Sequence, residues 1–121
     1  MPVLKVEIVE TPGWSRPSGL ARRIADAVAE VLGATPQSVW VRLTTIAPDD
    51  YAENGGAPTD VSPVFVTILE IVPPHGPPLA AQVAALTNAV ASACGRAEAD
   101  IHLVYEPPGR DRVAFGGRLV T

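Results

Sequence analysis

The chain has 121 residues, which suffices for one domain with a substantial hydrophobic core and is too short for two ordinary domains. Apolar residues make up 47% of the sequence, a proportion typical of a globular protein and not of a disordered one. The net charge of −4 provides no basic surface, so neither nucleic acid nor an anionic membrane is expected as a partner.

The N-terminal segment and the single cysteine indicate the compartment. Residues 1–6 lack the basic region and the long apolar stretch of a secretory signal, and charges or prolines interrupt every apolar run before it reaches the length of a membrane span. Cys94 has no second cysteine with which to form an internal disulfide. We therefore predict a cytoplasmic protein.

The first half of the chain predicts a strand, a helix and a second strand. Residues 2–9 alternate between apolar and charged side chains, which is typical of a half-buried strand. Apolar residues then recur at three- and four-residue spacing over 16–32, which predicts a helix with Ser15 or Ser18 as its N-cap. Residues 39–46 alternate again and predict a strand.

The second half repeats this order. A strand is predicted over 63–72, a helix over 77–94 and a strand over 101–105. The two halves also match residue by residue at a spacing of about 61 residues. The matched positions include the proline that opens each half and a glycine pair near its end: Pro2 with Pro63, and Gly55-Gly56 with Gly116-Gly117.

We interpret the chain as one domain, 1–121, made of two βαβ repeats, 2–56 and 63–117. Neither repeat could bury its helix alone, so the two must share one sheet. The predicted fold class is α/β (α+β), a duplicated β-α-β with a four-stranded mixed sheet and two helices on one face. The other face mixes charged residues with Trp40 and Phe65, and such a face is seldom left to solvent, so we expect oligomerisation through it.

A proline directly after the initiator methionine, opening an alternating strand in a duplicated βαβ chain, resembles the tautomerase superfamily. Residues 1–10 are similar to the start of 4-oxalocrotonate tautomerase and of malonate semialdehyde decarboxylase. Residues 39–42 and 51–56 resemble that family's second strand and its aromatic–Gly-Gly loop, and residues 113–117 repeat the loop. The resemblance covers nearly the whole chain and implies the trimeric tautomerase fold of two-repeat members such as macrophage migration inhibitory factor.

The resemblance implies that Pro2 is the catalytic residue. Keto–enol tautomerisation requires a base that is largely unprotonated near neutral pH and that returns the proton to another atom. Once Met1 is removed, Pro2 is a secondary amine, and an apolar pocket would lower its pKa toward the working pH. If Met1 stays attached, the Pro2 nitrogen is an amide, and the proline merely begins a strand, where its missing N–H is tolerated.

Four further residues follow from the resemblance as substrate-binding candidates. It places His102 on a strand position that reaches the proline of a neighbouring subunit, where the imidazole could bind a substrate oxygen or serve as a hydrogen-bonded interface residue. Trp40 stands where 4-oxalocrotonate tautomerase has an arginine, which disfavours a dicarboxylate substrate. Tyr51 and Phe115, each close to a glycine pair, would line a pocket or simply pack against their neighbours.

His75 and Arg42 complete the set of candidates. His75 follows the third predicted strand, near where the decarboxylase and dehalogenase branches carry arginines, and it could equally be an ordinary loop histidine. No arginine lies between Arg42 and Arg96, so those branches lack support. Arg42 could bind substrate or pair with Glu7 or Glu106 at a subunit interface.

Neither a metal nor a cofactor is expected. Two isolated histidines and one cysteine lack the spacing of metal ligands, and no glycine-rich phosphate loop follows a strand. The sequence therefore predicts a cofactor-independent keto–enol tautomerase or isomerase that acts on a small 2-keto or enol acid. The alternative is a non-catalytic, trimeric binding or scaffold protein whose Pro2 is blocked.

Overall fold

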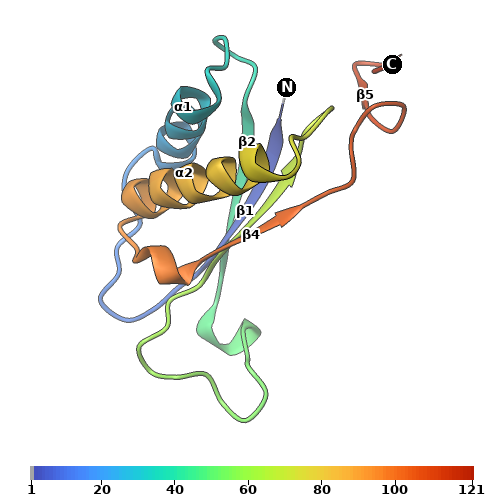
Figure 1. Cartoon of the computed structure of the whole chain (residues 1–121). Coiled ribbons are helices and arrows are strands. Elements are labelled where there is room, and N and C mark those ends of the chain that lie inside the picture. Colours follow the sequence, from blue (N-terminus) through green and yellow to red (C-terminus); the bar gives the residue numbers. More distant parts are fainter. Residues whose placement is uncertain (1) are drawn as a thin grey trace.

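The computed structural model describes residues 2–121 (Figure 1). The elements in chain order are β1 (Val3–Val9), α1 (Leu20–Leu32), β2 (Trp40–Ile46), the 3-10 turn η1 (Pro48–Asp50), β3 (Val64–Leu69), α2 (Pro77–Cys94), the 3-10 turn η2 (Glu98–Asp100), β4 (Ile101–Tyr105), β5 (Ala114–Phe115) and β6 (Arg118–Leu119). Neither helix in this described part of the chain combines the length and the apolar character that a membrane span needs.

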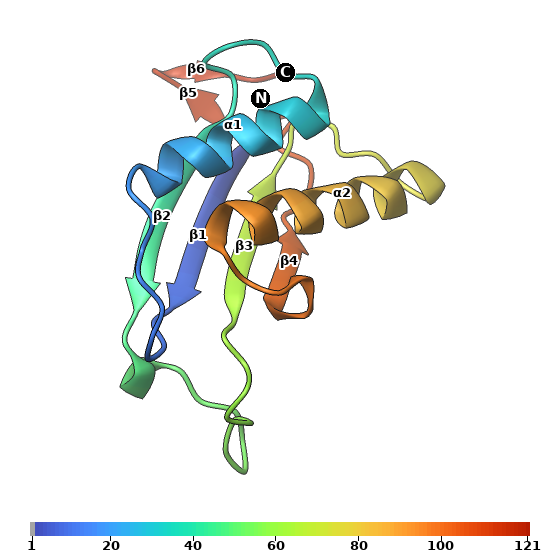
Figure 2. The same cartoon turned by 90° about the vertical axis from the view of Figure 1, so that its left-hand side faces the viewer.

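The main sheet has the strand order β2-β1-β3-β4. β1 runs parallel to β2 and β3 runs parallel to β4, whereas the two central strands, β1 and β3, are antiparallel. Both helices lie on the same face of this sheet (Figure 2). The predicted fold class, a four-stranded mixed sheet with two helices on one face, is confirmed.

The core lies between this sheet and the two helices. Side chains alternate along a strand, so every second residue of the central strands points to the helices and is buried. The buried strand residues are Leu4, Val6 and Ile8 of β1 with Val64, Val66 and Ile68 of β3. Leu20, Ile24 and Val28 of α1 and Leu86 and Val90 of α2 cover them. Burying each such side chain stabilises the fold by about 1.5–3 kcal/mol.

The start of α1 differs from the prediction. The helix begins at Leu20 and not near residue 16, its N-cap is Gly19 in the left-handed conformation (φ 64°), and no side chain caps it. The predicted N-cap, Ser15 or Ser18, is therefore wrong. Pro17 explains part of the delay, because a proline disfavours helical geometry in the residue before it.

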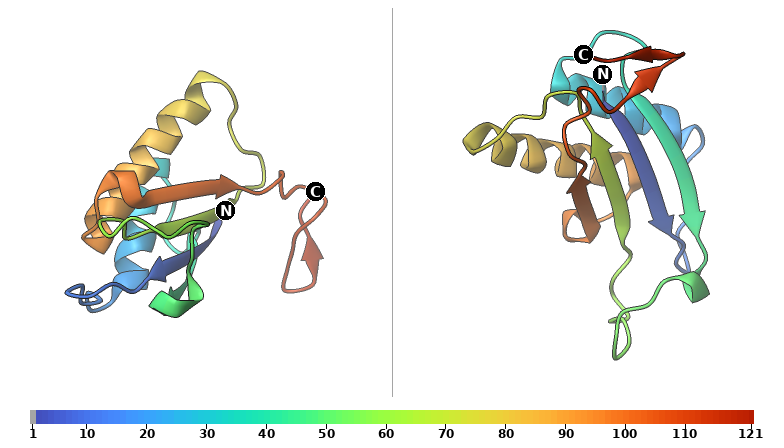
Figure 3. Two further views of the ribbon diagram at one scale, coloured as in Figure 1. Left: turned by 90° about the horizontal axis from the view of Figure 1, so that it is seen from below. Right: turned by 90° about the vertical axis from the view of Figure 1, so that its right-hand side faces the viewer.

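The short hairpin β5–β6 lies at the same end of the sheet as the N-terminus (Figures 1 and 3). Its turn is the Gly116-Gly117 pair, with φ values of 58° and 84°. Two consecutive positive φ values suit a tight hairpin turn, and glycine adopts them without strain. The Gly55-Gly56 pair also has positive φ values, but no strand flanks it, so the two glycine loops differ in structure.

Candidate functional site

Pro2 lies immediately before the central strand β1 and is buried. Its carbonyl oxygen accepts a hydrogen bond of 3.1 Å from the backbone N–H of Trp40, at the start of β2. This bond fixes the backbone at the end of the sheet where the hairpin β5–β6 also lies (Figure 3). The removal of Met1, on which the predicted chemistry depends, concerns a residue outside the described range.

A cavity of about 290 Å³ opens on the helix-free face beside Pro2. Its lining comes from β1, β2, β3 and the segment after β4: Val3, Lys5, Arg42, Thr67, Leu69, Glu106, Arg112 and Val113. Three of these side chains are cationic at neutral pH and one is acidic. The surplus of positive charge suits an anionic ligand such as a carboxylate.

The guanidinium of Arg112 is held in place at this cavity. Its Nη1 donates hydrogen bonds to the carbonyl oxygens of Pro107, at 2.9 Å, and Pro108, at 3.2 Å. Arg42 and Lys5 are directly opposite each other on neighbouring strands. Within residues 2–121 of one chain the structure contains a single salt bridge, between Arg22 and Asp26. The pairing of Arg42 with Glu7 or Glu106 across a subunit interface stays a prediction.

Trp40 and Phe115 lie at the same end of the sheet as Pro2. Trp40 is opposite Val3 in the register, and its ring meets Phe115 edge to face, with centroids 5.1 Å apart. The indole Nε1 donates to the carbonyl oxygen of Gln37 at 3.1 Å. Trp40 nevertheless remains 44% exposed, which is high for so large an apolar side chain.

His102 and Tyr51 gather at the opposite end of the sheet. The ring of Phe65 lies between them, with centroids 5.4 Å from His102 and 5.8 Å from Tyr51. The Tyr51 hydroxyl donates to Glu53, and this hydrogen bond raises the pKa of Tyr51. The register places His102 level with Glu7, about 16 Å along the strand from Pro2, so one chain does not bring the two together.

His75 lies in the loop between β3 and α2 and is exposed. It contributes nothing to the lining of the cavity beside Pro2. Within residues 2–121, the His, Cys, Asp and Glu side chains form no group of three that could hold a metal ion. The structure therefore divides the six predicted substrate-binding residues: Trp40, Arg42 and Phe115 lie near Pro2, His102 and Tyr51 lie far along the sheet, and His75 stands apart.

Sequence reasoning missed a polar cluster under the helices, formed by Glu70, Gln82 and Tyr105. The Tyr105 hydroxyl donates to Gln82 Oε1 at 2.7 Å. Burial raises the pKa of Glu70, although a hydrogen bond with Gln82 partly opposes this effect. Burial, together with the nearby charge of Glu70, raises the pKa of Tyr105 to about 12. A signal was present, because Glu70 follows Ile68 by two residues and so falls on the core-facing side of the strand pattern.

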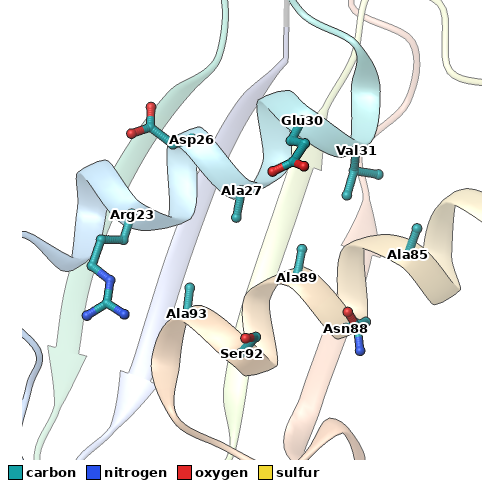
Figure 4. Close-up of a pocket in the computed structure, with 10 residues that line it drawn as sticks. All are labelled: Arg23, Asp26, Ala27, Glu30, Val31, Ala85, Asn88, Ala89, Ser92 and Ala93. Atoms are coloured by element: carbon teal, nitrogen blue, oxygen red, sulfur yellow. The ribbon is translucent and has the colours of Figure 1, made fainter.

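A larger cavity, of about 670 Å³, lies between α1 and α2 (Figure 4). Arg23, Asp26 and Glu30 of α1 line one side, and small residues of α2 such as Ala89 and Ala93 line the other. The groove lies on the helix side, and the sheet separates it from the helix-free face (Figure 2). It is therefore no part of the site beside Pro2.

Comparison with known proteins shows the fold. No protein-family model and no curated protein matches the sequence. Among solved structures, a fused 4-OT described as a symmetric trimer is 24% identical, with 95% of this chain and 93% of that chain covered and a TM-score of 0.70. The macrophage migration inhibitory factor from Trichinella spiralis is 16% identical, with 95% and 96% covered and a TM-score of 0.71.

A third match is the malonate semialdehyde decarboxylase FG41 inhibited by 3-bromopropiolate. It is 24% identical to this chain, with 94% of this chain and 90% of that chain covered and a TM-score of 0.64. These proteins are members of the tautomerase superfamily, so the chain has the tautomerase fold. At this level of identity the likeness establishes the fold and nothing about the reaction.

Proposed function

We propose that this protein is a cofactor-independent keto–enol tautomerase that uses Pro2 as its proton carrier on a small 2-keto or enol acid. One observation carries the proposal. In a tautomerase fold, Pro2 directly precedes the central strand, and the cavity lined by the next residue, Val3, also holds three cationic side chains and one acidic side chain. A secondary amine next to an anion-binding cavity is what proton transfer within an enol acid requires.

The cavity accounts for substrate binding in this proposal. A carboxylate would bind the guanidinium of Arg112, with Arg42 and Lys5 adding positive charge. Trp40 and Phe115 lie outside this lining and would add an aromatic surface at the same end of the sheet, and Trp40 supplies no charge for a second carboxylate. The favoured substrate class is therefore an aryl or alkyl 2-keto acid with one carboxylate.

A homotrimer is part of the same proposal. The helix-free face exposes Trp40 at 44% and Val104 at 56%, and such apolar area favours burial against another subunit. A fused 4-OT of the same fold is described as a symmetric trimer. In a trimer, His102 of one subunit would come to the Pro2 end of its neighbour and hold the substrate oxygen.

The test begins with the intact mass of the purified protein, which shows whether Met1 has been removed. Protein lacking Met1 should ketonise phenylenolpyruvate, followed by ultraviolet absorbance. Pro2→Ala leaves a primary amine of different basicity and geometry, and we expect a loss of rate of about 10² to 10⁴, the range of general acid–base catalysis.

Pro63→Ala is the matched control, because Pro63 occupies the equivalent place in the second half and has no free amine. Its carbonyl accepts a hydrogen bond from Val9 at 3.1 Å, as that of Pro2 does from Trp40, and a backbone carbonyl survives the substitution. Pro63→Ala should retain the parental rate. If Met1-free protein ketonises no small enol, or Pro2→Ala equals the parent, the catalytic proposal fails and the scaffold alternative takes its place.

A further inference from the structure

Continued by one position, the register of the two central strands brings Pro2 opposite Glu70. Val3 pairs with Leu69 and Leu4 pairs with Ile68, so the next position outward joins Pro2 and Glu70. Leu4 and Ile68 are both buried on the helix side, and alternation along the strand puts the side chain of Glu70 on that side as well. The nitrogen of Pro2 is a main-chain atom at the end of the sheet, between its two faces. Cβ atoms of directly opposed residues in antiparallel strands lie about 4.5–5.5 Å apart.

The carboxyl group of Glu70 has an unmet hydrogen-bonding requirement. Its Oε1 is buried and has no hydrogen-bond partner among residues 2–121. Gln82, which already accepts a hydrogen bond from the Tyr105 hydroxyl, approaches from α2 and bonds to the carboxyl group. A buried carboxyl oxygen without a donor is unfavourable, so a donor at this place would stabilise the ionised form.

Few charged groups face Glu70 from the elements around it. α2 carries no charged side chain, and on β4 the hydroxyl of Tyr105, with a pKa of about 12, is neutral at physiological pH. The segment after β4 contacts the backbone of Glu70, because the N–H of Gly109 donates to its carbonyl oxygen at 2.8 Å. Of the cations in this segment, Arg110 is exposed, and Nη1 of Arg112 is already bonded to two carbonyl oxygens. The amine that Pro2 gains on loss of Met1 is therefore the cation best placed to pair with Glu70.

We infer that Glu70 is a positioning residue whose carboxylate pairs with the amine of Pro2 in the processed chain and keeps that amine protonated near neutral pH. Two effects compete at Pro2. Burial favours the neutral amine, whereas an opposite charge within about 4–6 Å raises an amine pKa by about 1–3 units. We expect the carboxylate to prevail because the register, continued one position beyond Val3 and Leu69, brings Glu70 opposite Pro2.

The consequence for catalysis rests on the proposed function. A protonated Pro2 would donate its N–H proton to the enol carbon of the substrate. The proton of the enol hydroxyl would then return to the neutral amine, directly or through water, and restore the cation. Pro2 would thus start the reaction as an acid and not as the base that the sequence alone suggests, with Glu70 setting its protonation state.

The test measures the Pro2 amine directly and needs no substrate. The protein is produced with ¹⁵N-proline, and the removal of Met1 by methionyl aminopeptidase is verified by intact mass. The Pro2 nitrogen is then titrated by NMR. Glu70→Gln keeps the shape and removes the charge, and should lower the pKa of Pro2 by about one unit or more. Glu10→Gln is the control, because Glu10 is exposed just beyond the other end of β1 and should leave the titration unchanged.

Glu70→Asp provides a second reading if Glu70→Gln folds poorly. This variant keeps the charge but moves it away by one methylene group. The pKa of Pro2 should therefore fall by less than it does in Glu70→Gln. An unchanged Pro2 titration in Glu70→Gln, or in Glu70→Asp where only that variant folds, overturns the inference. This outcome is distinguishable from a failure of the proposed function, because a protein without activity would still show the lower pKa of Pro2 in Glu70→Gln.

Discussion

At the scale of single residues, Arg112 is the cation of the cavity whose position is fixed by hydrogen bonds, which suits it to the proposed substrate. Nη1 of its guanidinium is anchored by two backbone carbonyl oxygens, so less side-chain entropy is lost on binding than for a freely moving arginine. The sequence after β4 contains three arginines, Arg110, Arg112 and Arg118, and no pattern in it distinguishes them. Only the folded chain shows that Arg112 lines the cavity beside Pro2, whereas Arg110 is exposed and lies outside that lining.

Replacing Arg112 should therefore weaken substrate binding. A hydrogen bond to a charged group contributes about 1.5–3 kcal/mol, so Arg112→Ala should raise the KM for phenylenolpyruvate roughly ten-fold or more with a smaller change in kcat. Arg110→Ala is the matched control and should leave both constants unchanged. Steady-state kinetics with the acid and with its methyl ester provide the measurement. An equal effect of Arg112→Ala on both substrates would contradict carboxylate binding.

Prediction from the sequence succeeds or fails at individual residues for physical reasons. Pro2 stands out as a candidate because its position after Met1 and before an alternating strand is a property of the sequence, and its role stays a prediction. Glu70 could have been suspected from its place in the alternation, but its role depends on Pro2 lying opposite it. That register follows from the antiparallel pairing of β1 with β3, which no local pattern specifies.

At the scale of secondary-structure elements, periodicity predicted α2 and β4 with the bounds that the structure has. The start of α1 was not predictable in the same way, because a tertiary contact contributes to it. Trp14 lies before the helix, and its Nε1 donates to the carbonyl oxygen of Cys94 at 3.0 Å, at the far end of α2. The segment leading to α1 is thus attached to the end of α2 by a residue 80 positions away.

Arg96 joins the two halves of the chain at the same place. Its guanidinium lies 4.5 Å from the ring centre of Trp14, and it donates to the carbonyl oxygens of Ser62 at 2.7 Å and Val9 at 2.9 Å. One side chain therefore connects the end of α2 with the end of β1 and with the segment that leads into β3. We regard this contact as structural, because it lies at the opposite end of β1 from Pro2.

Substitution of Arg96 should reduce stability strongly. Arg96→Met keeps the aliphatic stem and leaves two carbonyl oxygens without their donor, and we expect a loss of about 2–4 kcal/mol in the free energy of unfolding. Arg96→Lys should restore part of the lost stability, because an ammonium group can still donate to a carbonyl oxygen but lacks the planar geometry of the guanidinium. Arg16→Met, at an exposed position in the loop before α1, should change stability little. Urea denaturation followed by tryptophan fluorescence measures all three, and equal midpoints for Arg96→Met and Arg16→Met would refute the assignment.

At the scale of the whole molecule, the sheet separates the candidate residues by its length. Trp40, Phe115 and the cavity lie at the Pro2 end, whereas His102, Phe65 and Tyr51 lie about 16 Å away along the strands. The sequence could place these residues on one face but could not show that a single chain keeps them apart. The repeat boundaries, 2–56 and 63–117, stay a prediction. A complete site that includes His102 therefore requires a neighbouring subunit.

This requirement gives a test that needs no structure of the assembly. Pro2→Ala and His102→Ala proteins are each purified, unfolded together in equal amounts and refolded. In a ring where Pro2 of one subunit meets His102 of the next, about one quarter of the sites in the mixture receive both intact residues. The value of kcat/KM for phenylenolpyruvate should then recover to about one quarter of the parental value, well above either variant alone, and sedimentation should show a trimer. If the mixture is no more active than the average of its two components, His102 does not act across a subunit boundary. A stable monomer at micromolar concentration would contradict the proposed trimer.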